Sequence, residues 1–546
     1  MPTITLNKKA FELLVGKELP LDQLKDRISM LGTDLESIEG NQIHVEIFPN
    51  RPDMLSEQGF ARAFSSFIGE KTGLRKYKVK DSGLRVIVDP SVTMRPYTAC
   101  AVIKGLTFNQ EKIAEIMQAQ EKLSTTHGRN RKKSAYGIYP LSNIRFPVNY
   151  VAKDPKEVMF QPLGFNYKIS ADKVEELHPK GKEYKHVAEG WEKYPFFIDS
   201  NSNIMCMLPY TNSSDMGKVD EKTKDVFIEC TGNNLENVTV ALNIFAAMFA
   251  DMGGEIYSLD IEYSDKTITT PNLKPRKMNL DLDYVNKRLG LALSEKETIE
   301  LLERMGYGYN GKVLVPAYRA DILHQVDLIE DIAIAYGYEN FEEEIPNVAT
   351  IGEENPFEKF AGRIRELLVG FGLLEAKNYH LITKKELTEN MNISSNPVYL
   401  KNALGEHNHL RNSLLPSLLK NLHENQHNEY PQNIFEIGRR FNFGNTETGV
   451  VENEHLSIIL CHEKTDFTEI KQILDALFAA LGLKVAVKET EHHSYIQGRA
   501  AKIFIKDKEI GIIGELHPQV LANWELVIPA VSLELNLEEV LNLLDI

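Results

Sequence analysis

Apolar residues recur at helical spacing near the start of the chain. Leu21, Leu24, Ile28 and Leu31 are three or four positions apart, and Gly32 follows them. This spacing places the four side chains on one face of a helix, and a glycine directly after the last of them is a common helix end. The pattern predicts an amphipathic helix that ends at Gly32.

A second apolar stripe, formed by Phe60, Phe64 and Phe67, follows the tight turn N-R-P-D at 50–53. Ser56 stands where a helix N-cap is expected, because its side chain can accept a hydrogen bond from a free backbone N–H. The turn residues are interpreted as turn chemistry. This first block, residues 1–88, is expected to be an α+β domain.

The next block, residues 89–268, consists mainly of short alternating stretches that predict β-strands. Its last strand ends at Thr231-Gly232, and a helix is expected to begin after Asn233 or Asn234. Polar residues between a strand and a helix often line binding sites, because backbone N–H groups are free there. A plain helix cap is an equally good interpretation at this point.

Two stretches rich in proline and charge, 264–279 and 340–360, separate the remaining blocks. Such stretches commonly mark domain boundaries. Residues 272–346 predict two short helices, a hairpin and an acidic helix, which is typical of a winged-helix-like module. Residues 356–546 alternate amphipathic helices with strands and predict an antiparallel sheet flanked by helices. The expected fold class is α+β with several domains.

Composition narrows the possible functions. The 546 residues carry a formal net charge of −16, which disfavours nucleic-acid binding by bulk phosphate attraction. The four cysteines are scattered without a C-x-x-C pair, so a zinc ribbon or disulfide framework is not expected. No apolar run is long enough for a membrane helix, and no secretory signal pattern occurs at the start. We expect a cytoplasmic protein with no membrane partner.

The acidic helix is the most unusual feature of the sequence. Asp327, Glu330 and Asp331 fall at positions i, i+3 and i+4, and Asp321 lies just before them. Like charges one turn apart repel each other, so a compensating group is expected. The candidates are the positive end of the helix, a basic partner, or a hard cation such as Mg²⁺, which binds carboxylate oxygens. An ordinary acid-rich helix start remains as good an interpretation as a magnesium site.

The segment H-E-N-Q-H at 423–427 matches the zinc-protease pattern H-E-x-x-H. Such a site needs both histidines on one helix and a third ligand. Here N-E-Y-P-Q-N follows directly, which predicts that the helix ends near His427, and no third ligand is evident. A zinc protease is therefore disfavoured. Glycine-rich phosphate-binding loops and a G-x-S-x-G nucleophile motif are also absent from the sequence.

Taken in order, five segments resemble one family, the β subunit of phenylalanyl-tRNA synthetase in its shorter archaeal and eukaryotic-like form. The resemblance extends over essentially the whole chain and is carried by FPNRPDMLSEQGFARAF, QEKLSTTHGRNRKKSAYGIYPLSNI, FIECTGNNLENVTVALNIFAAMF, VPAYRADILHQVDLIEDIAIAYGYENF and NALGEHNHLRNSLLPSLLKNL. The shorter segments FEIGRRF and GELHPQVL agree with it.

This resemblance implies a ligase of two α and two β chains that charges tRNA(Phe) with phenylalanine, using ATP as a substrate of the complex. The α subunit carries the aminoacylation site, so no residue of this chain is expected to catalyse that step. The class II catalytic-like domain at 356–546 is expected to lack an active site. The resemblance further implies that Asp321, Asp327, Glu330 and Asp331 bind Mg²⁺ at a site shared with the α subunit.

The block 89–268 resembles the family's editing domain, which hydrolyses tyrosyl-tRNA(Phe). An apolar phenylalanine pocket rejects an analogue that adds only a hydroxyl by about 10²-fold, so a second site is needed for higher accuracy. The resemblance places Phe197, Cys206, Glu229 and Thr231 in that pocket. Glu229 is expected to accept a hydrogen bond from the phenol, and Thr231 to help hold the ester or the attacking water.

The sequence departs from the family pattern near this pocket. Cys206 stands where a serine is expected, and Tyr139 and Pro140 replace polar residues of relatives. These differences predict altered or weak editing. Two alternative functions remain open: a stand-alone hydrolase that edits in trans, and a non-catalytic scaffold subunit without editing.

Overall fold

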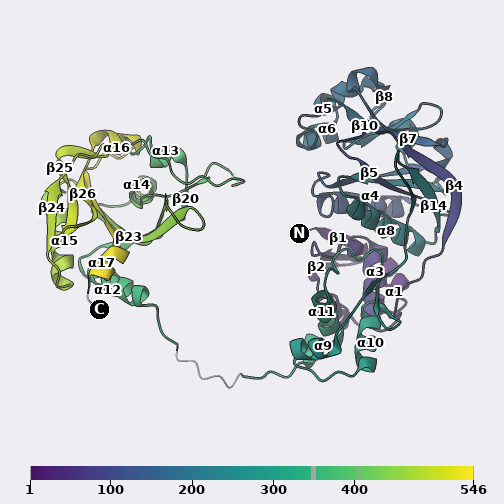
Figure 1. The fold of residues 1–546 in the computed structure, drawn as a ribbon, viewed down its shortest axis with the longest axis horizontal. Helices are drawn as coiled ribbons and strands as arrows, with labels where there is room; N and C mark the ends of the chain where they lie inside the picture. The colour runs from purple at the N-terminus through teal and green to yellow at the C-terminus, as the bar shows by residue number, and fades with distance from the viewer. Residues whose placement is uncertain (1, 346–351, 404, 545–546) are drawn as a thin grey trace. The chain divides into compact units, whose positions relative to one another are not determined.

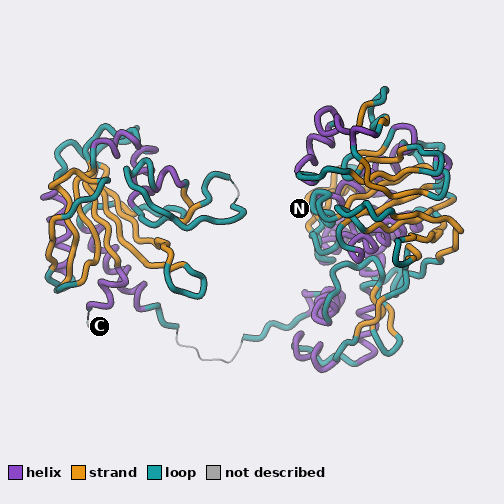
Figure 2. Tube along the Cα trace, turned by 45° about the horizontal axis from the view of Figure 1, so that its top comes forward, coloured by secondary structure: helices purple, strands orange, loops and turns teal. Residues whose placement is uncertain are grey.

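The computed structural model describes residues 2–345, 352–403 and 405–544. The chain forms two compact units, Met1–Ile345 and Pro346–Ile546, each with its own core (Figures 1 and 2). It is a mixed α/β multidomain fold with several sheets. No described helix is both long and apolar enough to cross a membrane.

The chain begins with a small α+β layer in which the three strands are ordered β1-β3-β2. Phe60 and Phe64 of the predicted stripe pack against Phe11. Ser56 caps the third helix by accepting a hydrogen bond from Gly59 N, as its position predicts. The elements are β1 (Thr3–Asn7), α1 (Lys8–Val15), α2 (Leu21–Met30), β2 (Asp34–Glu39), β3 (Gln42–Glu46) and α3 (Glu57–Phe67).

A ten-stranded mixed sheet follows, with the order β12-β11-β10-β7-β4-β14-β5-β13-β6 and β15 paired to β14. Its strands are β4 (Val79–Val88), β5 (Tyr97–Lys104), β6 (Ser134–Pro140), β7 (Val148–Lys153), β10 (Tyr194–Ile198), β11 (Ile204–Met207), β12 (Thr211–Asn212), β13 (Val226–Gly232), β14 (Glu255–Glu262) and β15 (Thr267–Thr270). Strand β4 pairs with β14 and β7, so this sheet extends back past the boundary expected at residue 88.

Helices cover one face of this sheet and join it to the N-terminal layer. Residues of α4, α8, β5 and β13 share one hydrophobic core with α1, α2 and α3, and Figure 1 shows α8 between the sheet and α3. The helices of this region are α4 (Gln110–Thr125), α5 (Val174–Leu177), α6 (Pro179–Tyr184), α7 (Ser214–Gly217) and α8 (Leu235–Asp251); a small ribbon consists of β8 (Met159–Phe160) and β9 (Ile169–Ser170).

The last part of the first unit contains three helices and a three-stranded ribbon ordered β16-β18-β17. Its elements are β16 (Arg276–Met278), α9 (Leu282–Leu289), α10 (Glu295–Arg304), β17 (Gly308–Tyr309), β18 (Val313–Val315) and α11 (Gln325–Tyr336). The helix pair, hairpin and acidic helix occur in the order that the sequence predicts. Val285, Leu302 and Leu328 pack into the same core as the N-terminal layer.

The second unit is built on a seven-stranded sheet with the order β19-β22-β23-β27-β26-β25-β24. All neighbours are antiparallel except β19 and β22. Its strands are β19 (Leu374–Glu375), β22 (Gln432–Phe443), β23 (Val450–Cys461), β24 (Val485–Glu489), β25 (Tyr495–Ile505), β26 (Lys508–Leu516) and β27 (Ala530–Asn536).

Helices cover both faces of this second sheet. Residues of α12 (Pro356–Gly370), α15 (Phe467–Ala480) and α17 (Leu537–Leu543) pack in one core, and those of α14 (Leu415–Glu424) and α16 (Pro518–Asn523) in another. A hairpin of β20 (Leu381–Ile382) and β21 (His409–Leu410) and the short α13 (Lys384–Leu387) complete the unit. Because α14 ends at Glu424, His427 lies beyond the helix, and the H-E-x-x-H spacing does not place both histidines on one helical face.

Candidate functional site

Two of the four acidic residues singled out in the sequence point inward to a buried arginine. Arg319 donates Nε and Nη2 to the two carboxylate oxygens of Asp321, at 2.8 and 2.7 Å. Its Nη2 also donates to Asp331 Oδ2 at 2.8 Å. Tyr307 Oη donates to the same oxygen of Asp331. Arg319 is therefore the basic partner that compensates this pair of acids.

The other two acids have different partners. Asp327 Oδ2 accepts hydrogen bonds from the backbone N–H groups of Leu323 and His324, at 2.7 and 2.8 Å, and so caps the start of α11. Glu330 is exposed and its Oε1 accepts a hydrogen bond from Tyr338 Oη at 2.7 Å. The contacts of Asp327 are those expected of an acid-rich helix start. Glu330 instead lies on the outer surface.

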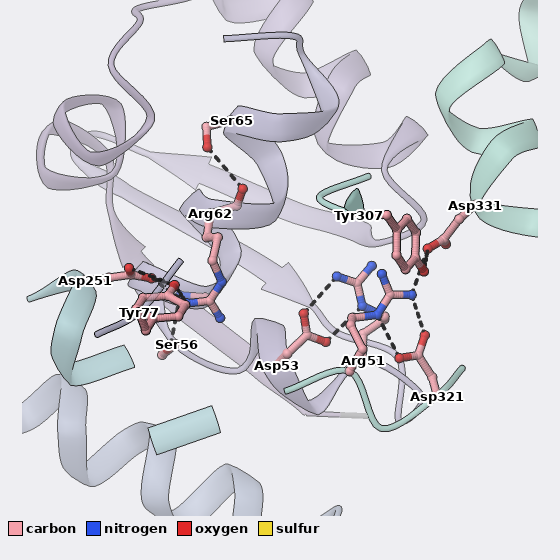
Figure 3. A network of polar contacts seen from close by, with 12 residues as sticks. Arg51, Asp53, Ser56, Arg62, Ser65, Tyr77, Asp251, Tyr307, Asp321 and Asp331 are labelled. Carbon is pink, nitrogen blue, oxygen red and sulfur yellow. Dashed lines mark hydrogen bonds and ion pairs between the residues drawn. The ribbon is translucent and has the colours of Figure 1, made fainter. Parts of the chain in front are cut away.

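The inward-facing acids belong to a larger polar network that joins distant parts of the chain (Figure 3). Arg51 and Asp53, from the N-R-P-D turn, form a buried two-point pair in which both distances are 2.9 Å. Burial and the nearby Arg319 act to lower the pKa of Arg51, but Asp53 and Asp321 outweigh them, so the pKa of Arg51 is raised. The turn therefore lies next to the acidic motif instead of on the surface.

A second arm of the network reaches α8. Arg62 of α3 forms an ion pair with Asp251 and donates to Tyr77 Oη at 3.2 Å. The Arg62 guanidinium also lies over the ring of Tyr318, 4.2 Å from the ring centroid. These contacts fix α3, α8 and the segment before α11 relative to one another.

Carboxylate oxygens are suitable ligands for Mg²⁺, but the four predicted residues do not form a complete site by themselves. Within residues 2–345, 352–403 and 405–544, no three His, Cys, Asp or Glu side chains lie together so that they could hold a metal ion. Both oxygens of Asp321 are already bonded to Arg319. A metal at this motif requires ligands from outside the chain or a rearrangement of the arginine.

The predicted editing-pocket residues lie together in the interior of the ten-stranded sheet. Glu229 and Thr231 are two positions apart on β13, so their side chains point to the same face. Phe197 on β10 faces Cys206 on β11 in register. Phe197, Cys206, Glu229 and Thr231 all have exposed fractions of 0%. All four side chains are thus closed off from solvent, and burial together with the nearby Glu229 raises the pKa of the Cys206 thiol.

Tyr139 connects the two ends of this sheet. It lies on β6, the last strand in the sheet order, and its Oη donates to Asn212 Oδ1 on β12, the first strand, at 3.0 Å. The same hydroxyl lies 3.2 Å from Glu229 Oε1. Tyr139, Phe197 and Cys206 share one hydrophobic cluster. The sheet therefore curls around these side chains, and the tyrosine fills the space between them.

Glu229 is an uncommon buried acid. Burial raises the pKa of its carboxyl to about 8, although the hydrogen bond from Tyr139 and the charges of Arg95 and Arg131 lower this pKa in part. The carboxyl is therefore largely protonated at pH 7. Glu229 Oε2 and Thr231 Oγ1 have no hydrogen-bond partner among the described residues. Buried polar atoms without partners are rare and often mark functional positions.

The second unit contains a cavity of about 530 Å³ beside β23 and β27, lined in part by Arg440, His455 and Glu534. His455 Nδ1 lies 3.5 Å from Glu534 Oε1. Burial and the nearby Arg440 lower the pKa of His455 to about 2, so the ring is neutral. The contact of His455 with Glu534 is therefore not an ion pair.

Sequence reasoning did not identify Arg319, Asn212 or Tyr307 as parts of these sites. Arg319 was recognisable in principle, because it stands two residues before Asp321 in the acidic segment. Asn212 and Tyr307 are brought to their partners by the sheet closure and by the packing of α10 against α11, which a linear pattern does not reveal.

Comparisons with known proteins agree on one family. A family model described as the phenylalanyl tRNA synthetase beta chain CLM domain matches residues 342–537, and one described as the tRNA synthetase B5 domain matches residues 278–338. The phenylalanine–tRNA ligase beta subunit of Pyrococcus abyssi is 38% identical over 98% of this chain and 99% of its own length. That of Archaeoglobus fulgidus is 39% identical over 98% of both.

A solved structure is also similar. The crystal structure of an N-terminal fragment of the phenylalanyl-tRNA synthetase beta subunit from Pyrococcus horikoshii superposes with a TM-score of 0.59 and 36% sequence identity. The match covers 61% of this chain and 99% of the fragment. The matched part of this chain therefore has the same fold as that fragment.

Proposed function

The chain belongs to the family of phenylalanine–tRNA ligase beta subunits, and on this premise we propose that it acts with an α subunit in the ATP-dependent charging of tRNA(Phe). The observation that carries this proposal is the full-length similarity to beta subunits at 36–39% identity. The chain supplies structure, and the α subunit supplies the aminoacylation site. The complex is proposed to contain two copies of each subunit.

The surface around the acidic motif supports contact with a partner. Leu323, Val326 and Tyr338 have exposed fractions of 76%, 44% and 52%, and they lie close in sequence to Asp327 and Glu330. Apolar side chains gathered beside charged groups are typical of protein interfaces. We assign this surface, defined by these five residues, as a contact for the α subunit.

Magnesium is proposed to bind at the same surface. Of the predicted ligands Asp321, Asp327, Glu330 and Asp331, the two whose partners are not Arg319, Asp327 and Glu330, would hold the ion directly. Asp321 and Asp331 pair with Arg319 and would position the segment that carries the ligands. When bound, the ion supplies positive charge between carboxylates of the two subunits. The α subunit must provide the remaining ligands.

The domain assignment proposed here follows the family. An N-terminal domain ends before Val79 rather than at residue 88, because β4 belongs to the large sheet. The editing domain contains the ten-stranded sheet, the winged-helix-like module extends over 272–346, and the class II catalytic-like domain over 356–546. Since the chain is acidic, the α subunit is expected to provide much of the tRNA-binding charge.

We also propose that the editing domain recognises the tyrosyl group of tyrosyl-tRNA(Phe). The support comes from Glu229, a buried acceptor for a phenol hydroxyl, and from Thr231, whose hydroxyl has no partner among the described residues. A buried hydrogen-bonding pair can distinguish tyrosine from phenylalanine much better than an apolar pocket. The sequence offers no Ser-His-Asp set or other general base for this step, so a positioned water is the proposed nucleophile.

Co-expression tests the proposal on partnership. The chain and its cognate α subunit are expected to co-purify and to elute together at the size of a four-chain complex. Elution of this chain alone, with no α subunit retained, would contradict it and would favour a stand-alone hydrolase. Leu323→Ser should weaken this co-purification, whereas the matched control Leu163→Ser, at a residue that is 38% exposed but far along the chain from the proposed contact surface, should not.

A further inference from the structure

The acceptor proposed for the substrate phenol already has a phenol as its partner. Tyr139 Oη lies 3.2 Å from Glu229 Oε1 and also donates to Asn212 at 3.0 Å. Tyr139 itself has an exposed fraction of 0%. The hydroxyl of this chain's own tyrosine therefore occupies the hydrogen-bonding position that a tyrosyl group would need.

A glycine makes this arrangement possible. Gly137 lies directly opposite Glu229 in the pairing of β6 with β13. A Cβ atom at Gly137 would collide with both Tyr139 Oη and Glu229 Oε1. Because Gly137 has no side chain, the ring of Tyr139, two positions along the same strand, can extend over it to reach Glu229. Local sequence and pairing register thus direct the tyrosine into the pocket.

Tyr139 pairs with only some of the hydrogen-bonding atoms of the pocket. Glu229 Oε2 and Thr231 Oγ1 have no hydrogen-bond partner among the described residues. The Tyr139 hydroxyl has a single proton, which it shares between Glu229 and Asn212. One oxygen of Glu229 and the hydroxyl of Thr231 therefore stay available to a ligand while Tyr139 holds the other oxygen of Glu229.

We propose that Tyr139 is a built-in occupant of the phenol-binding end of the pocket, and that a tyrosyl group enters only when Tyr139 is displaced. This inference rests on the proposed editing function. Tyr139 is then the residue that limits editing specificity in this chain, because it competes with the substrate for Glu229 and Asn212.

Ligand binding to a vacated pocket tests the occupancy. In the complex with the α subunit, Tyr139→Ala is expected to create a buried space that accepts p-cresol, the tyrosine side chain as a free molecule. Buried spaces made by such truncations bind small aromatic molecules. Millimolar p-cresol should raise the Tm of this variant by several degrees, and toluene, which lacks the hydroxyl, should raise it less.

The matched control is Tyr136→Ala. Tyr136 is buried on the same strand but points to the opposite face, where its hydroxyl contacts Ser134. Its truncation leaves a similar space in which the Ser134 hydroxyl, and not Glu229, can pair with a phenol, so the preference for p-cresol over toluene should be smaller than in Tyr139→Ala. Equal effects of the two molecules on Tyr139→Ala, or no effect of either, would overturn the inference. If the alanine variant does not fold, Tyr139→Leu, which removes the hydroxyl that pairs with Glu229 and Asn212, serves in the hydrolysis test below.

The rate of tyrosyl-tRNA(Phe) hydrolysis distinguishes a failure of the inference about Tyr139 from a failure of the editing proposal. Tyr139→Ala or Tyr139→Leu should raise the rate about tenfold or more, and adding Glu229→Ala should remove the gain. Preference for p-cresol without faster hydrolysis would support Tyr139 as the occupant while contradicting editing. Fast hydrolysis by the wild-type complex, unchanged by either Tyr139 substitution, would overturn the inference and leave editing intact.

Discussion

Glu229 and Arg319 are both buried ionisable residues, but their surroundings differ. Arg319 contacts two carboxylates directly, so its charge is balanced inside the protein. Among the described residues, the one hydrogen-bond partner of the Glu229 carboxyl is the neutral hydroxyl of Tyr139, and burial raises the pKa of this carboxyl to about 8. A balanced charge persists in a core, whereas an unbalanced acid takes up a proton.

Glu229 should therefore make stability depend on pH. Between its ordinary pKa of 4.5 and the folded value of about 8, the folded chain holds one more proton than the unfolded chain. The free energy of unfolding then falls by up to about 1.4 kcal/mol for each pH unit in this window. This contribution is complete below pH 4.5 and is lost as the pH rises through 8.

Glu229→Gln should flatten this dependence. Stability is measured by urea unfolding at intervals from pH 5 to pH 9. The wild type and the Glu229→Gln variant both carry Trp524→Phe, so the emission of Trp191 reports on the first unit alone. The wild type should lose stability with rising pH relative to Glu229→Gln. Parallel curves for the two proteins would show that the Glu229 carboxyl is not buried in this way.

Arg319 should be essential for the stability of the first unit. Arg319→Met leaves Asp321 and Asp331 without their cation and should cost about 3–5 kcal/mol in the free energy of unfolding. The control Arg85→Met breaks an exposed pair with Glu262 and should cost less than about 1 kcal/mol. Equal costs in the same urea experiment would contradict a buried network.

The sequence predicted single residues well where local chemistry defines their role. The cap at Ser56 and the placement of Glu229 and Thr231 on one strand face follow from nearby residues alone. Interpreting Arg51 and Asp53 as turn chemistry captured their mutual pair but not their burial beside Arg319. That contact depends on packing between segments far apart in the chain.

At the scale of single elements, helix α11 carries acidic residues with two different roles. Its first turn is capped by Asp327, and its outer face carries Glu330. The macrodipole favours acids at this end, so the crowded carboxylates are compatible with a stable helix even without metal. From the sequence, an acid-rich helix start and a magnesium site explained these carboxylates equally well. Two backbone hydrogen bonds to Asp327 now establish the helix cap.

Two substitutions at Asp327 separate capping from metal binding. Asp327→Asn retains a side-chain oxygen that can cap the helix, whereas Asp327→Ala does not. The alanine variant should lose about 1 kcal/mol in the free energy of unfolding of the chain alone, and the asparagine variant much less. Both should weaken Mg²⁺-dependent assembly with the α subunit, measured by sizing in a magnesium titration. Assembly by Asp327→Asn with unchanged magnesium dependence would exclude Asp327 as a ligand.

The pairing of strands into sheets was the less predictable part of the fold. The alternating pattern of β4 is visible in the sequence, but its membership of the large sheet depends on parallel pairing with β14, about 170 residues later. The end of α14 before His427 was predictable, since the following polar stretch contains a proline. Local signals fix where elements begin and end, whereas sheet partners are set by tertiary packing.

At the scale of the whole molecule, the chain consists of two units, each with its own core. Several large apolar side chains of the second unit are exposed near β19 and the hairpin, among them Leu374 at 71% and Tyr379 at 91%. Exposed apolar residues of this size are expected at interfaces of a permanent complex. They agree with a protein that functions as one subunit of a larger assembly.

The most direct test of this account is the charging of tRNA(Phe) with phenylalanine by the purified α subunit, measured with and without this chain. The account predicts that charging occurs only when both subunits are present, and that the activity elutes with the complex. Normal charging by the α subunit alone, unaffected by addition of this chain, would contradict it.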